Sequence, residues 1–217
     1  MTLTKDAVCV WLADLTGLSA HSEILRASLS VDEQERALRM NDSKTRERFE
    51  LARGLLRHIL SKSLGCSPES LEFEYGEHGK PALCAPFTRL SFNASHSKDL
   101  VTVAMTTQES IGIDIEWTRE LSNEKLFAKK LLSSHEHFIY EGLPVESKAL
   151  FLFEQWTAKE ALGKATGKGI SWPVQDVEAL NTNHVVTRFV PRAGCVGAIA
   201  TPRVASSIEY REWPEKT

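Results

Sequence analysis

The stretch Gly112-Ile113-Asp114-Ile115-Glu116-Trp117 is the part of this chain that says most about its fold. Isoleucines alternate with glycine or acidic residues, and alternation at period two predicts a β-strand with one buried face. The other face then carries the carboxylates of Asp114 and Glu116, about 7 Å apart because a strand rises roughly 3.3 Å per residue. Two acids on one face repel each other unless a cation lies between them. A divalent metal ion is the simplest such cation.

A second informative stretch, residues 156–164, reads WTAKEALGK. Trp156, Glu160 and Lys164 recur at every fourth position, so a helix would place them on one stripe. A tryptophan is costly on a solvent-facing surface, which suggests that this stripe lines a cleft. The alternative is an exposed Glu160–Lys164 ion pair, which contributes only roughly 0.2–0.5 kcal/mol.

Length and composition describe an ordinary globular protein. The chain has 217 residues, 42% of them hydrophobic and 25% charged, which allows one mid-sized domain or two small ones with a core of their own. The net charge of -3 argues against non-specific nucleic-acid binding, because such binding requires a basic surface. No apolar run reaches the roughly 18 residues of a membrane span, and residues 1–20 lack the features of a secretory signal.

Cysteine spacing points to a reducing compartment. Cys9, Cys66, Cys84 and Cys195 form no C-x-x-C pair, which removes the usual zinc and redox signatures. Together with the missing signal and membrane span, this predicts a cytoplasmic protein that binds neither nucleic acid nor membranes.

The hydrophobic pattern predicts strands and helices in the same order in both halves of the chain. A capping box of Ser30 and Glu33 begins one helix, and Gly65 ends a long amphipathic one. In the first half we expect strands at 8–12, 71–75, 90–92 and 100–105, a turn at 93–97 and a helix over 45–64. In the second half we expect helices at 134–140 and 148–166, a stop at 167–169, and strands at 177–180, 185–190 and 195–200.

An internal repeat accounts for this common order. Shifting the sequence by 102 residues superimposes Gly65 on Gly167, together with a few other matches. Chance is the alternative, because the identities are few. We expect an α/β (α+β) fold of two similar α/β subdomains, residues 1–107 and 108–217, related by a pseudo-two-fold axis. A ligand cleft would then lie between the subdomains.

Four short motifs occur along the chain: GKP at 79–81, FNASHS at 92–97, GIDIE at 112–116 and WxxKEAxxK at 156–164. In sequence and order they resemble the 4′-phosphopantetheinyl transferases of the Sfp type. The resemblance implies the fold of those enzymes and transfer of 4′-phosphopantetheine from coenzyme A to a serine of an apo acyl or peptidyl carrier protein. Adenosine 3′,5′-bisphosphate would be released, and Mg²⁺ would be required.

The resemblance also implies that Asp114, Glu116 and Glu160 hold the magnesium ion. Mg²⁺ prefers a few carboxylates together with phosphate oxygens and water, so the ion would bridge the diphosphate of coenzyme A. The expected catalytic residues are Asp114, Glu160 and Lys164. Glu160 would take the proton of the incoming serine hydroxyl, directly or through a metal-bound water, and Lys164 would neutralise the departing phosphate. The alternative for Asp114 and Glu116 is a solvent-facing pair of acids.

Coenzyme A is expected to contact residues from several motifs. Ser95 and His96 offer a hydroxyl, an imidazole and turn amides to a phosphate oxygen, unless they form an ordinary surface turn. The 3′-phosphate of coenzyme A needs a basic partner. The long helix provides Arg48, with Arg53 as the second choice, unless these arginines are simply solvated. The full expected set is Arg48, Arg53, Lys80, Ser95, His96, Lys159 and Lys164.

Two further residues and one surface follow from the same resemblance. Arg36 is the basic residue upstream of the long helix that could join the phosphate site, and Glu136 stands where the family tends to place an acid. The acidic helices of carrier proteins would suit a basic rim near residues 125–130, although these lysines equally fit a solvated helix face. A monomer would suffice, because both halves are present in one chain.

Two other functions use the same residues. A metal-dependent phosphohydrolase acting on a nucleotide or on the diphosphate of coenzyme A would use the three acids with water as the nucleophile. A non-catalytic module would only bind coenzyme A or a nucleotide. Hydrolases commonly assemble richer acid or histidine clusters, and a binding module has little need for Glu160 beside Lys164. The sequence therefore favours the transferase.

Overall fold

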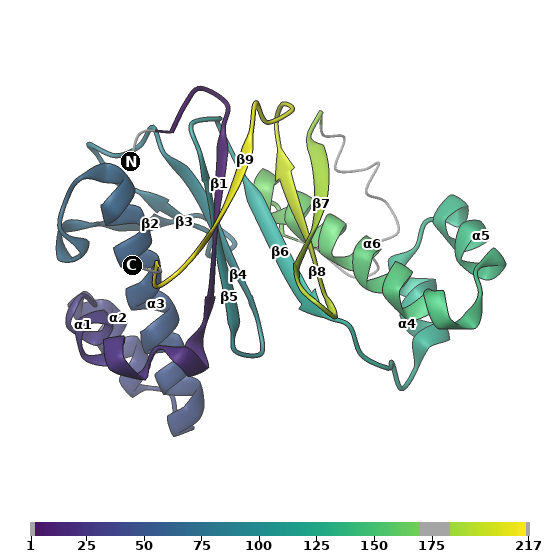
Figure 1. The fold of residues 1–217 in the computed structure, drawn as a ribbon, viewed down its shortest axis with the longest axis horizontal. Coiled ribbons are helices and arrows are strands. Elements are labelled where there is room, and N and C mark those ends of the chain that lie inside the picture. The colour runs from purple at the N-terminus through teal and green to yellow at the C-terminus, as the bar shows by residue number, and fades with distance from the viewer. Residues whose placement is uncertain (1–2, 170–182, 216–217) are drawn as a thin grey trace.

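Two β-sheets pack face to face at the centre of the molecule, and one long helix covers the outer face of each (Figure 1). The computed structural model describes residues 3–169 and 183–215. Its mixed α and β architecture agrees with the predicted fold class, while the strand predicted at 177–180 lies outside the described residues. In this part of the chain, no helix combines the length and the apolarity that a membrane crossing needs.

The first sheet has the strand order β4-β5-β1-β9, and helix α3 packs on its outer face. Trp11 of the sheet and Leu55 of the helix are each 1% exposed in the core between them. A small sheet of β2 and β3 adjoins this core. The elements of the first half are β1 (Val8–Asp14), η1 (Leu15–Gly17), η2 (Ser19–His21), α1 (Ser22–Ala27), α2 (Val31–Leu38), α3 (Ser43–Leu64), η3 (Pro68–Ser70), β2 (Phe73–Tyr75), β3 (Pro81–Leu83), β4 (Ser91–Ser97) and β5 (Leu100–Thr106).

The second sheet has the order β6-β8-β7, and helix α6 covers it. Two shorter helices, α4 and α5, form a lobe at the far end of α6 (Figure 1). The elements of the second half are β6 (Gly112–Trp117), α4 (Glu124–Leu131), α5 (Ser134–Gly142), α6 (Val145–Thr166), β7 (Val185–Arg192), β8 (Cys195–Thr201) and β9 (Ile208–Glu212).

The two halves repeat one topology. The order β4-β5-β1 in the first sheet corresponds to β7-β8-β6 in the second, and each bound of α6 lies 102 residues after the same bound of α3. Both helices end at a glycine with a left-handed backbone, Gly65 and Gly167, each with a φ of 70°. Glycine adopts this conformation without a steric penalty. The predicted repeat is therefore confirmed.

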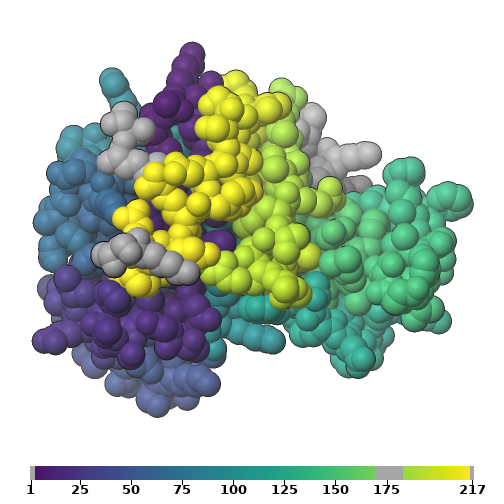
Figure 2. Space-filling model, viewed as in Figure 1, coloured from purple at the N-terminus to yellow at the C-terminus, as the bar shows by residue number. Residues whose placement is uncertain are grey.

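The last strand leaves the second half. Strand β9 pairs in parallel with β1 of the first sheet, and Figure 2 shows this C-terminal segment lying over the first half. The pairing covers backbone groups of β1 that would otherwise form a sheet edge. The predicted boundary at residues 107 and 108 therefore does not hold for 208–212, which extend the first sheet.

The turn predicted at 93–97 is wrong, because these residues belong to strand β4. The β4–β5 hairpin turns at Lys98 and Asp99 instead, and Lys98 has a φ of 54°. Phe92 and Ala94 pack into the first core on one face of β4. The alternate polar side chains resemble a turn in the sequence, but on the strand they form hydrogen bonds with β6.

Helix α6 approaches strand β6 closely at Gly112. A Cβ atom built on Gly112 would lie 1.9 Å from the carbonyl oxygen of Ala161 and 2.5 Å from the backbone nitrogen of Ala165. Only a residue without a side chain leaves room for this contact. The close approach brings the side chains of α6 to the carboxylates of β6.

We expect Gly112→Ala to lower both thermal stability and transfer activity, because α6 must move away from β6. Overpacking costs about 1–3 kcal/mol, and in a chain of this size each kcal/mol lowers the Tm by roughly 2–4 °C. Thermal unfolding measures the effect. The control is Gly142→Ala, whose added Cβ would meet nothing within 4 Å. An unchanged Tm for Gly112→Ala would mean that helix and strand are further apart than described.

Candidate active site

Strands β4 and β6 and helix α6 meet at the carboxylate of Asp114. Ile113 and Ile115 on the same strand are fully buried, as the alternation predicts, and Asp114 is 5% exposed. Asp114 Oδ1 accepts hydrogen bonds from the ammonium of Lys164 and from the hydroxyl of Ser95, each at 2.7 Å. Three elements from both halves of the chain therefore contribute to one site.

The two oxygens of Asp114 have different environments. Oδ1 is shared by Ser95 and Lys164, and the Lys164 ammonium also lies 3.2 Å from Ser95 Oγ and 3.2 Å from the carbonyl oxygen of Ile113. Oδ2 is buried and has no hydrogen-bond partner among the described residues. A buried carboxylate oxygen without a partner is costly, so Oδ2 is suited to receive a further positive group.

Glu160 lies in the same electrostatic environment, one turn before Lys164 on α6. Burial raises the pKa of its carboxyl, and the nearby charges of Asp114 and Glu116 raise this pKa further. The ammonium of Lys164 opposes these effects, but the pKa remains above its ordinary value. The three acids are thus close enough to repel one another.

Glu116 receives its hydrogen bond from a residue that the sequence analysis did not single out. The hydroxyl of Ser97 donates to Glu116 Oε2 at 2.7 Å, and Arg119 Nη1 lies 3.6 Å from the same oxygen. Ser97 stands two residues after Ser95 on one face of β4. The alternation of polar residues at 93, 95 and 97 is the signal for this contact, although the same residue types also favour the turn predicted there.

These residues fit a hard divalent cation by their chemistry. Within residues 3–169 and 183–215, no three His, Cys, Asp or Glu side chains are already gathered in the way that holds a metal ion. The cation beside Asp114 is the ammonium of Lys164. The unpartnered Oδ2 of Asp114 and the mutual repulsion acting on Glu160 leave negative charge uncompensated. Carboxylate oxygens of this kind are the ligands that Mg²⁺ prefers.

A cavity of about 540 Å³ between α3 and β4 brings together four of the residues expected to bind coenzyme A. These are Arg48 and Arg53 from α3 and Ser95 and His96 from β4. Ser95 also contacts Asp114, so the cavity adjoins the acidic site. The remaining lining residues are Leu15, Met40, Thr45, Phe49, Ala52, Leu56, Ala94, Lys98 and Val101.

The two arginines of this cavity differ in their burial and in the number of side chains that they contact. Arg48 is partly exposed, and its Nε lies 2.6 Å from Asp99 Oδ1; this hydrogen bond lowers the pKa of Asp99. Arg53 is mostly buried, pairs with Glu33 and donates to Tyr75 Oη at 2.5 Å. The alternative of simply solvated arginines is therefore wrong for Arg53. Of the two, Arg48 has the more accessible charge.

Lys80 lies away from this cavity. Its ammonium donates to the carbonyl oxygens of Ile111, at 3.0 Å, and Ala165, at 3.4 Å. Burial lowers the pKa of Lys80 to about 8. Lys80 therefore joins the loop before β3 to the start of β6 and the end of α6. The expected contact between Lys80 and coenzyme A stays a prediction.

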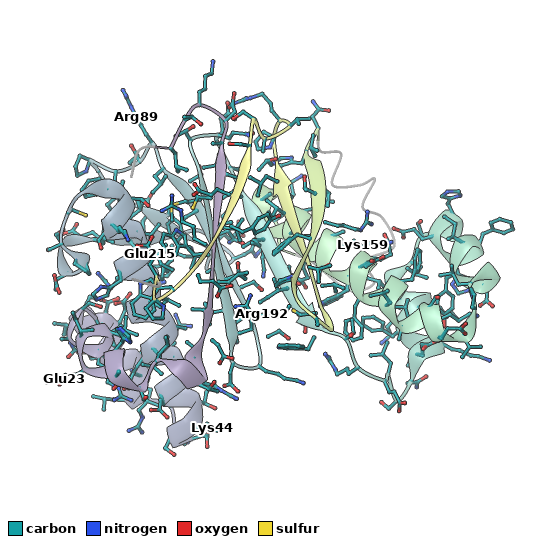
Figure 3. The ribbon with its side chains drawn as sticks, in the orientation of Figure 1. Glu23, Lys44, Arg89, Lys159, Arg192 and Glu215 are labelled. Atoms are coloured by element: carbon teal, nitrogen blue, oxygen red, sulfur yellow. The ribbon has the colours of Figure 1, made fainter. Side chains whose placement is uncertain are left out.

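Lys159 lies on α6 (Figure 3), and its ammonium contacts α4 and α5. Its ammonium is buried and lies 2.5 Å from the carbonyl oxygen of Leu131 and 2.7 Å from Glu136 Oε2. Glu136 in turn forms a capping box with Ser133 at the start of α5. Consecutive residues on a helix do not face the same way, so Lys159 cannot share the direction of Glu160. Lys159 and Glu136 thus join α6 to the α4–α5 lobe, and the expected contact of Lys159 with coenzyme A stays a prediction.

Trp156 packs on this lobe too. Its ring centroid lies 5.8 Å from that of Phe127 in α4, within a cluster that includes Leu121 and Phe151. The inference that Trp156 lines a cleft is therefore wrong. Helix α4 covers this part of the stripe, and only the part of α6 with Glu160 and Lys164 reaches the acidic site.

Comparison with known proteins points to one family. A family model of the 4′-phosphopantetheinyl transferase superfamily matches residues 110–195, and a model of the N-terminal part of 4′-phosphopantetheinyl transferases matches residues 18–108. The 4′-phosphopantetheinyl transferase HetI from Nostoc sp. is 36% identical over 213 residues, which are 92% of this chain and 90% of HetI.

Two other relatives have the same activity in their names. The 4′-phosphopantetheinyl transferase AcpT from Escherichia coli is 36% identical over 157 residues, 72% of this chain and 76% of AcpT. The 4′-phosphopantetheinyl transferase Sfp from Bacillus subtilis is 30% identical over 154 residues, 70% of this chain and 66% of Sfp. The chain therefore belongs to the 4′-phosphopantetheinyl transferase superfamily and is an enzyme that transfers phosphopantetheine from coenzyme A to carrier proteins.

Proposed function

We propose that the transfer takes place where β4, β6 and α6 meet, with Asp114, Glu116 and Glu160 holding a magnesium ion. The observation that supports this most is the buried, unpartnered Oδ2 of Asp114 beside two further acids. When bound, the ion supplies positive charge to the diphosphate of coenzyme A. The remaining tasks of the protein's own side chains are to position the diphosphate and to accept the proton of the carrier serine.

Glu160 is the proposed general base. Burial and the neighbouring acids raise its pKa in the absence of a cation, and a carboxylate within hydrogen-bond reach of a hydroxyl can take its proton. Glu160 would accept the proton of the carrier serine while the serine oxygen bonds to phosphorus. The bond from that phosphorus to the oxygen of the adenosine bisphosphate breaks in the same displacement. Such a reaction depends chiefly on positioning and charge.

Lys164 is the proposed partner of the developing phosphate charge. Its ammonium lies at the junction of Asp114 and Ser95, on the face of β4 that is turned to β6. A donor fixed in this position before the reaction can stabilise an anion without reorganising. Asp114 would contribute by holding both Lys164 and the cation.

The adenosine 3′,5′-bisphosphate part of coenzyme A is proposed to occupy the cavity between α3 and β4. The 3′-phosphate carries about -1.5 to -2 charges at neutral pH. Arg48 is its proposed partner, with His96 beside it on β4. Arg36 stacks on the ring of Phe49, 5.3 Å from its centroid, and Phe49 lines the cavity. Arg36 is thus placed to add a second positive charge.

The carrier protein is proposed to dock beside α4. A surface cavity of about 440 Å³ lies there, lined by Leu121, Ser122, Asn123, Leu126, Phe127 and Lys130. Its apolar floor and basic neighbours, Lys125 and Lys129, would suit an acidic helix with apolar anchors. The carrier serine would then reach Glu160 along α6, which connects this surface with the acids.

The proposed organisation is two functional halves in one chain. The first half, residues 1–107, holds the nucleotide of coenzyme A, and the second half, from 108, carries the acids and the base, with β9 returning to the first sheet. Because both halves are in one chain, a monomer would suffice. A cytoplasmic location is proposed, since the four cysteines are free and disulfides are rare in a reducing compartment.

The metal requirement has a direct test. The purified protein is treated with a chelator and incubated with coenzyme A and an apo carrier protein, and the mass of the carrier is then measured. We expect no change without metal and a gain of one phosphopantetheine on a serine after Mg²⁺ is added. Full transfer in the presence of excess chelator would remove the magnesium proposal while leaving the family assignment intact.

The same reaction distinguishes the phosphohydrolase alternative, which the names of HetI, AcpT and Sfp do not support. A hydrolase would release phosphate or nucleotide from coenzyme A in the absence of carrier. A transferase releases adenosine 3′,5′-bisphosphate only in step with the mass gain of the carrier.

A further inference from the structure

Strands β4 and β6 run side by side in the same direction but belong to different sheets. Side chains of β4 therefore replace the backbone ladder that would join neighbouring strands of one sheet. Three such contacts follow one another in the same order along both strands. Asn93 Oδ1 accepts from the backbone nitrogen of Ile113 at 2.9 Å. Ser95 Oγ donates to Asp114 Oδ1 and Ser97 Oγ donates to Glu116 Oε2, each at 2.7 Å.

The hydroxyl of Ser97 forms two hydrogen bonds, as the acceptor in one and as the donor in the other. Its hydroxyl oxygen accepts from the backbone nitrogen of Trp117 at 3.2 Å, and its hydroxyl hydrogen is donated to Glu116. A serine hydroxyl has a single hydrogen to donate. Ser97 is 7% exposed, so solvent has little access to this arrangement. The hydroxyl is thus anchored to the backbone one residue beyond the carboxylate that it holds.

Glu116 has more need of such a contact than Asp114. Glutamate has one more rotatable bond than aspartate, so fixing its carboxylate costs more conformational entropy. The side chain of Glu116 is 24% exposed, and its other neighbour, Arg119, is 56% exposed and 3.6 Å away. An exposed ion pair of this kind contributes about 0–1 kcal/mol. Ser97 is therefore the stronger constraint on the direction of Glu116.

We propose that Ser97 is a positioning residue that holds Oε2 of Glu116 and thereby orients this carboxylate towards the divalent cation. Ser95 has the matching contact on Asp114, where Oδ1 is held and Oδ2 has no partner among the described residues. Two serines spaced by two residues on β4 thus align two acids spaced by two residues on β6. The inference rests on the proposed magnesium site, because it assigns Glu116 to that ion.

The test compares Mn²⁺ binding in Ser97→Ala and wild type, with Mn²⁺ in place of Mg²⁺. The electron paramagnetic resonance signal of free Mn²⁺ gives the Kd, with coenzyme A present and no carrier, so turnover is absent. Losing a partner that orients a metal-binding side chain weakens binding by about 10- to 100-fold. We expect a loss in this range for Ser97→Ala and near wild-type binding for Ser97→Thr, which keeps the hydroxyl.

Two further variants separate positioning from stability. Ser28→Ala also removes a fully buried hydroxyl, one that donates to the carbonyl oxygen of Leu25, and it should leave the Kd of Mn²⁺ unchanged. If Ser97→Ala does not fold, Ser97→Cys against Ser97→Thr gives the same comparison, because a thiol is a weak donor of similar size. We expect weakened binding for the cysteine variant only.

Each outcome has one interpretation. Absence of Mn²⁺ binding by wild type would overturn the proposed metal site itself. Binding by wild type with an unchanged Kd for Ser97→Ala, or equal weakening in Ser97→Ala and Ser28→Ala, would overturn only the role of Ser97. If Ser97→Ala does not fold, equal Kd values for Ser97→Cys and Ser97→Thr would overturn the role of Ser97 as well.

Discussion

Glu160→Gln should reduce the turnover number for transfer to a carrier serine by about two to four orders of magnitude, the range that a general base contributes. Glutamine keeps the size of the side chain but cannot accept the proton. Single-turnover transfer from coenzyme A to an apo carrier, followed by the mass of the carrier, measures the rate. Glu146→Gln, at the exposed first turn of the same helix, is the matched control and should retain the wild-type rate.

Although Glu160→Gln should lower the turnover number, it should raise the stability of the folded state. In the absence of divalent ions, the folded state raises the pKa of Glu160 above its ordinary value of 4.5. The proton is then bound more tightly in the folded chain, so the contribution of Glu160 to stability is present below pH 4.5 and is lost as the pH rises through the raised pKa. Glu160→Gln cannot lose a proton and avoids this loss.

We therefore expect the variant to be more stable than wild type at neutral pH, by an amount that shrinks as the pH falls towards 4.5. Urea unfolding at several pH values measures the difference. A rate within about ten-fold of wild type would remove the assignment of Glu160 as the base. A pH-independent stability difference would instead show that Glu160 is not in the repulsive environment described here.

Local patterns were sufficient to predict the central elements of the fold. The alternation around Asp114 predicted β6, and the apolar spacing before Gly65 and Gly167 predicted the two long helices and their repeat. Contacts between distant residues were not predictable in this way. Strand β9 pairs with β1, at the opposite end of the sequence, and no local pattern at 208–212 indicates that partner.

The candidate site shows the same division. The resemblance to the family predicted that Asp114, Glu160 and Lys164 lie near one another, whereas strand and helix periodicity predicted only the face on which each side chain lies. Lys159 does not share the direction of Glu160, since adjacency in the sequence is not adjacency on a helix surface. Ser97 was missed because its partners lie on β6, and a polar run looks like a turn until the strand that satisfies it is known.

Asp114→Asn should abolish transfer and also remove the stabilisation of the protein by Mg²⁺. A ligand at 100 times its Kd stabilises the folded state by about 2.7 kcal/mol, so the Tm of wild type should rise by several degrees as Mg²⁺ is added with coenzyme A. Asparagine retains the shape of the side chain but lacks the charge that draws the ion to Oδ2. The Tm of the variant should therefore not respond to Mg²⁺.

The fold should survive this substitution, because two electrostatic changes oppose each other. Lys164 loses the carboxylate 2.7 Å from its ammonium, whereas Glu160 loses the repulsion that raises its pKa. Glu160 and Lys164 attract each other, and the ammonium is 28% exposed, so the cost stays below the roughly 3–5 kcal/mol of breaking a fully buried pair. In Asp114→Asn, the carboxylate of Glu160 thus replaces that of Asp114 as the acid that attracts the Lys164 ammonium.

Asp42→Asn provides the control for this experiment. Asp42 caps helix α3 and accepts from the backbone nitrogen of Thr45, and asparagine caps helices about as well as aspartate. This variant loses the same charge away from the acids and should keep both its activity and its response to Mg²⁺. A Tm that rises with Mg²⁺ in Asp114→Asn as it does in Asp42→Asn would mean that the ion binds without Asp114. The base and the cation would then have to be assigned to different carboxylates.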